Sequence, residues 1–240
     1  MLISGTNQAS PVERGATLSE QVADAILRGA IERRIPFGTR LVEAEIAREL
    51  NVSRVPVREA LRLLYTQGLV ENQSQRGMCL ISVTNRVLEE TLTVRHHLET
   101  LAVTSAVQNL ESNQTTLDGL QAALEEMKVA SASGSATTMA ASDVSFHRAI
   151  LQMTNNQTLL FVWETLARKF QVIVGIAWYS DDQKRIYEQH VELLKLFKKR
   201  DLPALLTALK PHIMEGLEIG APGVHDTLPE SEIKSASLVL

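Results

Sequence analysis

The most informative stretch of this chain is residues 51–61, which read NVSRVPVREAL. Ser53 is of a residue type that commonly caps helix N-termini, and the proline three positions later falls in a first helical turn, where its missing N–H is harmless. A helix is therefore predicted from Ser53 to about residue 67. Arg54 and Arg58 are four residues apart, so they share one outward face of this helix near its positive end.

The flanking sequence predicts the other parts of a winged helix-turn-helix. Residues 17–20 (TLSE) form a capping-box pattern that begins a helix of about four turns, which Pro36 ends. A short helix over roughly 43–50 precedes the three-residue turn 51–53. Two β-prone runs, 69–71 and 78–83, follow as a wing. Leu61, Leu64 and Tyr65 are predicted to form the inner face of the helix after the turn.

From Thr84 onward the sequence shows only helical periodicity, broken at five places by capping residues. The fold class is therefore mainly α, with an N-terminal winged helix-turn-helix and a C-terminal all-α bundle. Its six helices are expected at 85–110, 114–131, 136–153, 157–180, 182–200 and 202–219. The predicted domains are an arm at 1–16, a DNA-binding domain at 17–84, a helical domain at 85–220 and a tail at 221–240.

Composition narrows the function classes. The chain has 240 residues, of which 45% are hydrophobic, and no apolar run reaches the ~18 residues needed to cross a bilayer. No secretory signal is visible at the start, so a cytoplasmic protein without a membrane partner is expected. The only cysteine, Cys79, excludes an internal disulfide. The net charge is −4, but residues 1–80 hold ten arginines and no lysine, which suits bidentate contacts to phosphate and guanine.

The predicted helix after the turn is a candidate DNA-reading element. Its N-terminus offers free N–H groups to phosphate, and its arginines can reach guanine edges in the major groove. The alternative is a solvated helix in which Glu59 pairs with Arg58 or with Arg62. Arg76 and Gly77, at the tip of the predicted wing, are placed to enter the minor groove.

Four residues of the helical segment form a candidate metal site. Asp143 and His147 are one turn apart on one helix face, and His190 and His212 lie in later helices. One oxygen and three nitrogen ligands suit Zn²⁺, with Ni²⁺, Co²⁺ and Mn²⁺ as alternatives. Taken singly, each residue could instead serve as a helix cap, a buried core histidine or a surface histidine.

The pattern of residues 41–77 resembles the winged-helix domain of GntR-family bacterial transcription regulators. The resemblance includes Leu41-Val42-Glu43, the run from Leu50 to Leu61, Gly68-Leu69-Val70 and Arg76-Gly77, and it spans roughly residues 15–84. At Ala44 the sequence departs from several members, which carry arginine. The resemblance implies double-stranded operator DNA as a partner, contacted by Ser53, Arg54, Val55, Pro56, Arg58, Arg76 and Gly77.

Residues 85–219 resemble the FCD ligand domain of the FadR-type branch, in its six-helix VanR-like subgroup. The residues that carry this resemblance include Val94-Arg95, Leu98-Glu99, Phe146-His147-Arg148-Ala149-Ile150 and His212-Ile213. Many members bind a divalent metal through one Asp and three His, which match Asp143, His147, His190 and His212. Small carboxylates often bind beside that metal. Arg95 could anchor such an effector; equally, it could pair with Glu99 at i+4.

Together these features predict a ligand-responsive transcription regulator that binds an inverted repeat as a homodimer. Repression is the predicted sign of regulation. The competing interpretation is a metal-dependent enzyme that acts on a small acid. The sequence lacks an HExxH helix, a GxSxG elbow and a phosphate-binding glycine loop, so no catalytic residue is assigned and a non-enzyme is expected. A third possibility is a structural metal without any effector.

Overall fold

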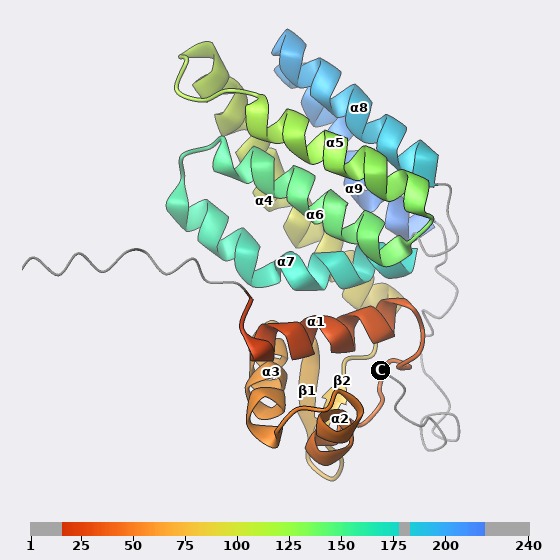
Figure 1. Ribbon diagram of the computed structural model, residues 1–240. Helices are drawn as coiled ribbons and strands as arrows, with labels where there is room; N and C mark the ends of the chain where they lie inside the picture. Colours follow the sequence, from red (N-terminus) through yellow and green to blue (C-terminus); the bar gives the residue numbers. More distant parts are fainter. Residues whose placement is uncertain (1–15, 178–182, 219–240) are drawn as a thin grey trace, which may run out of the picture.

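The computed structural model describes residues 16–177 and 183–218 (Figure 1). Within those ranges the chain forms nine helices and one two-stranded antiparallel sheet. The predicted tail, all but the last residue of the predicted arm, and residues 178–180 of one predicted helix lie outside the described residues. The expected mainly α architecture, with a winged helix-turn-helix followed by a helical bundle, is confirmed.

The N-terminal part contains three helices, α1 (Leu18–Ile31), α2 (Glu43–Glu49) and α3 (Arg54–Thr66), and two strands, β1 (Val70–Gln73) and β2 (Gly77–Leu80). The predicted capping box begins α1. The Thr17 N–H donates to Glu20 Oε2 at 2.7 Å, and the Glu20 N–H donates to Thr17 Oγ1 at 3.2 Å. The strands pair so that Val70 faces Leu80 and Gln73 faces Gly77.

The turn between α2 and α3 depends on Asn51, whose φ of 52° lies in the left-handed region that asparagine tolerates. Ser53 occupies the N-cap position of α3, but its hydroxyl accepts no hydrogen bond from the helix. Leu61 and Leu64 are buried as expected. Tyr65 is 53% exposed, so its predicted place on the inner face is wrong. It follows Leu64 and is turned about 100° from it around the helix axis, which carries its ring to the edge of the buried face.

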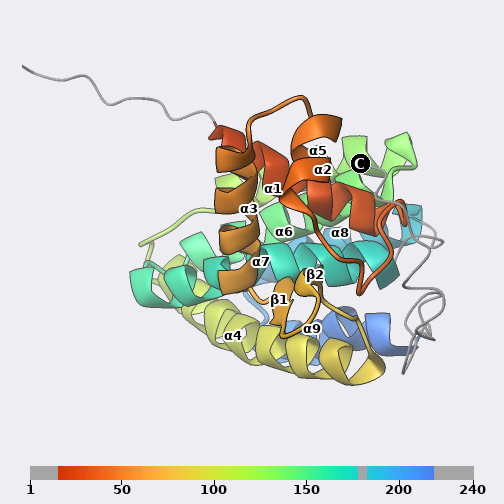
Figure 2. The same ribbon diagram turned by 90° about the horizontal axis from the view of Figure 1, so that it is seen from below.

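The C-terminal part forms the six expected helices. They are α4 (Asn85–Glu111), α5 (Asp118–Ser133), α6 (Ala136–Gln152), α7 (Gln157–Ala177), α8 (Gln183–Lys199) and α9 (Leu202–Glu218). The main difference is α5, which starts four residues later than predicted. Asn156 caps α7, since its Oδ1 accepts from the Leu159 N–H at 3.0 Å. Figure 2 shows α4 lying alongside α9.

Two apolar cores are present, one in each half, and the halves meet along α1. Figure 1 shows α1 lying beneath α7. The core around α1 also takes in Ala136 from α6 and Val172 from α7. At Gly175 the helices approach so closely that an added Cβ would lie 2.9 Å from Ile31 Cγ2. The two halves therefore share packed side chains.

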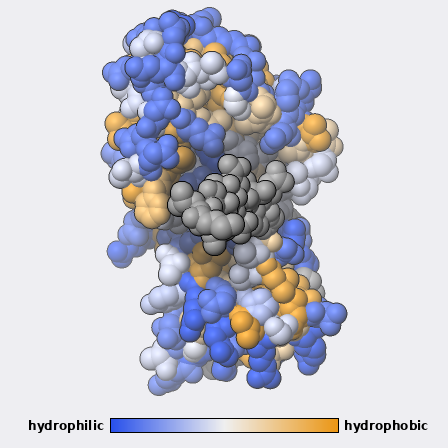
Figure 3. Space-filling view, turned by 60° about the vertical axis from the view of Figure 1, so that its left-hand side comes forward, coloured by the Kyte–Doolittle hydropathy of each residue, from blue (hydrophilic) through white to orange (hydrophobic). Residues whose placement is uncertain are grey.

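The face of the molecule drawn in Figure 3 is mostly hydrophilic, with smaller hydrophobic patches on both the upper and the lower lobe. Within the described ranges, none of the helices combines the length and the apolar character that crossing a bilayer requires.

Candidate DNA-reading surface and metal centre

The start of α3 carries an exposed arginine that has no ion-pair partner among the described residues. Arg54 is the first residue of the helix, it is exposed, and among the described residues it forms no ion pair. Ser53 beside it is exposed, Pro56 is half-buried, and the apolar side chain of Val55 is 67% exposed. This end of the helix therefore offers a cation, a hydroxyl and an apolar group to a partner outside the chain.

Arg58 is held in place by a carboxylate of the preceding helix. Its Nε and Nη2 donate to Glu43 Oε1 and Oε2 at 3.0 and 2.9 Å, and 52% of its side chain remains exposed. The hydrogen bond from Arg58 lowers the pKa of the Glu43 carboxyl. Glu59 pairs with Arg62 instead, at 2.8 Å, as one of the sequence alternatives allowed. Arg54 and Arg58 thus both face outward, but only Arg54 is without a partner in the described part of the chain.

The wing ends in a tight turn at the position that the sequence indicated. Gly77 has a φ of 74°, and an added Cβ there would meet no atom within 4 Å. The Arg76 N–H donates to the Gln73 carbonyl at 3.0 Å, and the Arg76 side chain is half-buried. Glycine is therefore favoured at this position by the left-handed backbone conformation of the turn, and no neighbouring atom crowds it.

The four predicted metal ligands come together inside the helical bundle. Asp143 and His147 come from α6, His190 from α8 and His212 from α9, and all four are buried. One ligand atom from each lies within 4.8 Å of the others. The His190 Nε2 is 3.1 Å from Asp143 Oδ1, and the Nε2 atoms of His147 and His212 are 3.1 Å apart.

The imidazole rings are oriented so that their Nε2 atoms face this point. His190 Nδ1 lies 2.8 Å from the Ile186 carbonyl, and because a carbonyl only accepts, Nδ1 carries the proton and Nε2 is free as a ligand. His147 Nδ1 pairs with Glu99 Oε2 at 2.5 Å, and neither of these buried atoms has a further partner among the described residues. The Nδ1 atom of His212 is buried without a partner among the described residues.

A buried ion network surrounds the cluster. Arg95 Nε donates to Glu99 Oε1 at 2.8 Å, and its Nη2 donates to Asp143 Oδ2 at 2.9 Å. The Trp163 indole N–H also donates to Glu99 Oε1, at 3.0 Å. Of the two alternatives for Arg95, the structure contains the Glu99 pair, and a contact between Arg95 and an effector stays a prediction. Sequence reasoning missed that Glu99 also touches His147, because no local spacing links residues 48 apart.

The electrostatics of the network favour ionised carboxylates. Burial is the largest single effect on Glu99 and works to raise its pKa, but Arg95 and His147 together outweigh it and lower that pKa to about 2. Burial also works to raise the pKa of Asp143, but Arg95, His147 and His190 together hold that pKa well below its usual range. For His147, burial opposes the charged form, yet Glu99 and Asp143 raise its pKa. Metal-free protein therefore tends to carry a proton on His147.

The other two histidines tend to be neutral. Burial lowers the pKa of His190, and burial together with the neighbouring His190 and His147 holds the pKa of His212 well below its ordinary value. A neutral imidazole is the form that binds a metal.

This donor set fits a divalent transition ion. Ligands at about 2.0–2.2 Å from a tetrahedral Zn²⁺ lie about 3.3–3.6 Å from one another. The His147 Nε2 to Asp143 Oδ1 distance is 3.4 Å, and the two 3.1 Å contacts are slightly shorter. Metal-binding histidines are usually oriented by a hydrogen bond from the second ring nitrogen to a carbonyl or carboxylate. His190 forms such a bond with the Ile186 carbonyl. The orphaned Nδ1 of His212 lacks such a neighbour within the described residues.

The fold defines a class of regulator in which a winged helix-turn-helix is attached to an all-α domain. The profile of the bacterial regulatory proteins of the gntR family matches residues 18–80, and the FCD domain profile matches residues 90–215. The chain therefore belongs to the GntR family, in its FadR-type, FCD-containing branch. The resemblance drawn from the sequence is confirmed, and so is the expectation of a regulator and not an enzyme.

Individual relatives agree with this assignment. The gluconate operon transcriptional repressor of Bacillus licheniformis is 27% identical over 83% of this chain and 82% of its own length. The Nta operon transcriptional regulator of Aminobacter aminovorans is 29% identical over 76% of this chain and 86% of its own length. Among solved structures, Escherichia coli McbR/YncC shares the fold with a TM-score of 0.68 at 24% identity, covering 85% of this chain and 97% of that one.

Proposed function

We propose that this protein is a transcriptional repressor that binds an inverted-repeat operator through α3 and the wing. The observation that carries the proposal is that Arg54, at the start of α3, is exposed and forms no ion pair among the described residues, next to the exposed Val55. An arginine there suits the guanine O6 and N7 acceptors of the major groove, and an apolar side chain suits a thymine methyl. Names of relatives such as the gluconate operon repressor support the sign of regulation.

The remaining DNA contacts in this proposal have different roles. Arg58 is presented in a fixed orientation by Glu43, and its exposed half contacts a base or phosphate beside Arg54. Ser53 and Pro56 lie at the helix N-terminus, where free N–H groups favour a phosphate. Arg76 and Gly77 bring the wing to the minor groove. As a regulator of bacterial genes, the protein acts in the cytoplasm.

The helical domain, in this proposal, binds a divalent metal through Asp143, His147, His190 and His212. Zn²⁺ is the first choice, and Ni²⁺, Co²⁺ and Mn²⁺ remain alternatives because they also accept imidazole and carboxylate ligands. A bound ion would supply a Lewis-acidic point at which the oxygens of a small carboxylate effector bind. Arg95 binds Asp143 through Oδ2, so that Oδ1 faces the three imidazoles and is available as a metal ligand.

Exposed apolar side chains on the helical domain support a homodimer. Val94 and Leu101 of α4 are 46% and 51% exposed, and their spacing of seven residues places them on one helix face. Phe161 and Val162 of α7 are 70% and 40% exposed. Exposed apolar patches commonly mark interaction sites, and a two-fold dimer presents two recognition helices to two half-sites.

The test uses operator DNA recovered by selecting random duplexes on the purified protein. Arg54→Ala is expected to weaken operator binding about 5- to 150-fold, the range for loss of a bidentate base contact, while the metal content measured by elemental analysis stays unchanged. The matched control is Arg62→Ala, which removes an exposed arginine of the same helix that pairs with Glu59. Equal affinities for wild type and Arg54→Ala would rule out the proposed reading helix.

Effector sensing has a separate test. Metal-loaded protein is screened against small carboxylates by thermal melting, and operator affinity is then measured with each stabilising compound. An effector acts only through its different affinity for the DNA-bound and free arrangements, so unchanged operator affinity would leave no role for it.

A further inference from the structure

A pocket lies between the two halves of the molecule, away from the Asp/His cluster. Its volume is about 470 Å³, within the range of small-molecule sites. One wall is the face of α1 that carries Arg28, and the other comes from the start of α6 and from Gln171 of α7. We propose that this pocket binds a small organic anion, with carboxylate or phosphate oxygens at Arg28.

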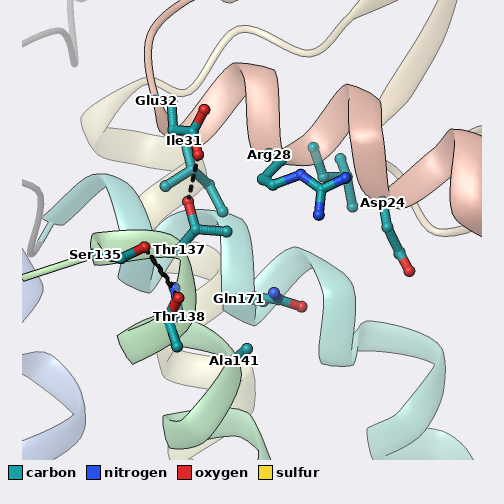
Figure 4. Close-up of a pocket in the computed structure, with 10 residues that line it drawn as sticks. Asp24, Arg28, Ile31, Glu32, Ser135, Thr137, Thr138, Ala141 and Gln171 are labelled. Carbon is teal, nitrogen blue, oxygen red and sulfur yellow. Dashed lines mark hydrogen bonds between the residues drawn. The ribbon is translucent and has the colours of Figure 1, made fainter. Parts of the chain in front are cut away.

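The first argument is that donors in the pocket lack protein partners. Among the described residues, the guanidinium of Arg28 forms no ion pair, and the carboxamide of Gln171 takes part in no hydrogen bond. Figure 4 shows Arg28 along the lower side of α1, with Gln171 below it on α7. A guanidinium fork matches carboxylate and phosphate oxygens, and an amide can both donate to and accept from the rest of the ligand.

The second argument concerns the acids in the same wall, which would repel an anion if they were uncompensated. Asp24 and Glu32 lie four residues on either side of Arg28, within reach of it along the helix. Each has another partner: Asp24 pairs with Arg168 at 3.1 Å, and Glu32 pairs with Arg34 at 2.6 Å. Each of the two carboxylates is therefore paired with an arginine from outside the pocket lining, and the positive charge of Arg28 is left for a ligand.

The third argument is the remaining lining. The hydroxyls of Ser135 and Thr138 bond to each other at 3.0 Å, and that of Thr137 lies 3.5 Å from Glu32. Leu27 and Ile31 of α1 contribute apolar surface on the opposite wall. The pocket therefore suits an anion with a short carbon skeleton and one or more hydroxyl groups.

A ligand at this place would touch both halves of the molecule at once. Its anionic end would contact α1 of the DNA-binding part, and its other end would contact α6 and α7 of the bundle. Such a ligand stabilises the arrangement of the two halves seen here over any arrangement that separates α1 from α7. This site goes beyond the proposed effector site, because it uses none of the four candidate metal ligands.

The test measures binding directly, without DNA. Full-length protein is stripped of metal with a chelator, dialysed, and titrated with inorganic phosphate, glycerol 3-phosphate and glycerate, with calorimetry and ligand-observed NMR as readouts. At least one probe is expected to bind saturably at millimolar concentrations or below. Arg28→Gln and Gln171→Leu should each weaken that binding, the first by about tenfold or more because a charged hydrogen bond is lost.

Two further variants separate this site from others. Lys128→Gln removes an exposed cation on α5, outside the pocket, and His212→Ala disables the candidate metal centre; both should bind the probe like wild type. The preference between phosphate and carboxylate probes identifies the ligand chemistry. Absence of saturable binding for all three probes, equal binding by Arg28→Gln, or loss of binding in His212→Ala would each overturn the proposal.

Discussion

Replacement of Arg95 by methionine tests how the buried network is stabilised. Arg95 is 2% exposed, and it is the cation that lies against both Glu99 and Asp143, whose side chains are fully buried. Methionine fills much of the same volume but removes the guanidinium from two buried carboxylates, which keep only His147 as a shared cationic neighbour among the described residues. Breaking a buried pair in this way typically costs about 3–5 kcal/mol, a large part of a total unfolding free energy of about 5–15 kcal/mol.

The pH dependence of stability should change sign in this variant. In the wild type, the lowered pKa values of Glu99 and Asp143 add stability above their unfolded values of 4.5 and 3.8, and that stability is lost as the pH falls toward 2. Without Arg95, burial, which is the largest single effect at both carboxylates, is opposed mainly by His147, and both pKa values rise. The folded state then binds protons more readily than the unfolded state, so the variant gains stability as the pH falls from 7 toward 5.

The assay is urea unfolding of metal-stripped protein, followed by circular dichroism at several pH values. The matched control is Arg86→Met, because Arg86 pairs with Glu90 on the same helix at the same i,i+4 spacing but is 85% exposed. The control should unfold like the wild type at every pH. If Arg95→Met lost no more stability than Arg86→Met, or kept the wild-type pH dependence, the reasoning about the buried network would be refuted.

Three other predictions follow from the structure. Because the pKa of His147 is raised, metal binding at pH 6.5 should release between about half and one proton, measured by calorimetry in buffers of different ionisation enthalpy; no release would contradict the proposed ligand role. Gly175→Ala should destabilise the protein by about 1–3 kcal/mol in urea unfolding, since its Cβ would crowd Ile31 at the contact between the halves, and an unchanged midpoint would show that the helices separate freely. Glu43→Gln should release Arg58 and steepen the salt dependence of DNA binding by up to about one counterion in filter-binding titrations, whereas an unchanged slope would place Arg58 away from the phosphates.

Much of the local structure follows from short-range chemistry. Thr17 and Glu20 cap α1, Asn51 forms the turn before α3, and Asn156 caps α7, as the sequence predicts. These features depend on hydrogen bonds and backbone preferences within a few residues, so their signals are readable from the chain. The same holds for Asp143 and His147, whose spacing alone places them on one helix face.

Other features could not be predicted in this way. The exposure of Tyr65 depends on where the buried face of α3 is centred, which is determined by the helices that pack against it. The choice of Glu43 as the partner of Arg58 depends on the crossing of α2 over α3, and it was not among the alternatives that the sequence offered.

The sequence by itself determined the order of the helices, the winged helix-turn-helix and the identity of four residues able to bind a metal. Only the tertiary structure decided that α6, α8 and α9 bring these four residues within 4.8 Å, that Arg95 joins Glu99 to Asp143, and that a pocket forms between α1 and the bundle. The physical reason is the sequence separation over which the stabilising interactions act. Caps and turns are stabilised within one or two helical turns, whereas the cluster and the pocket depend on packing between residues far apart in the chain, which no local pattern encodes.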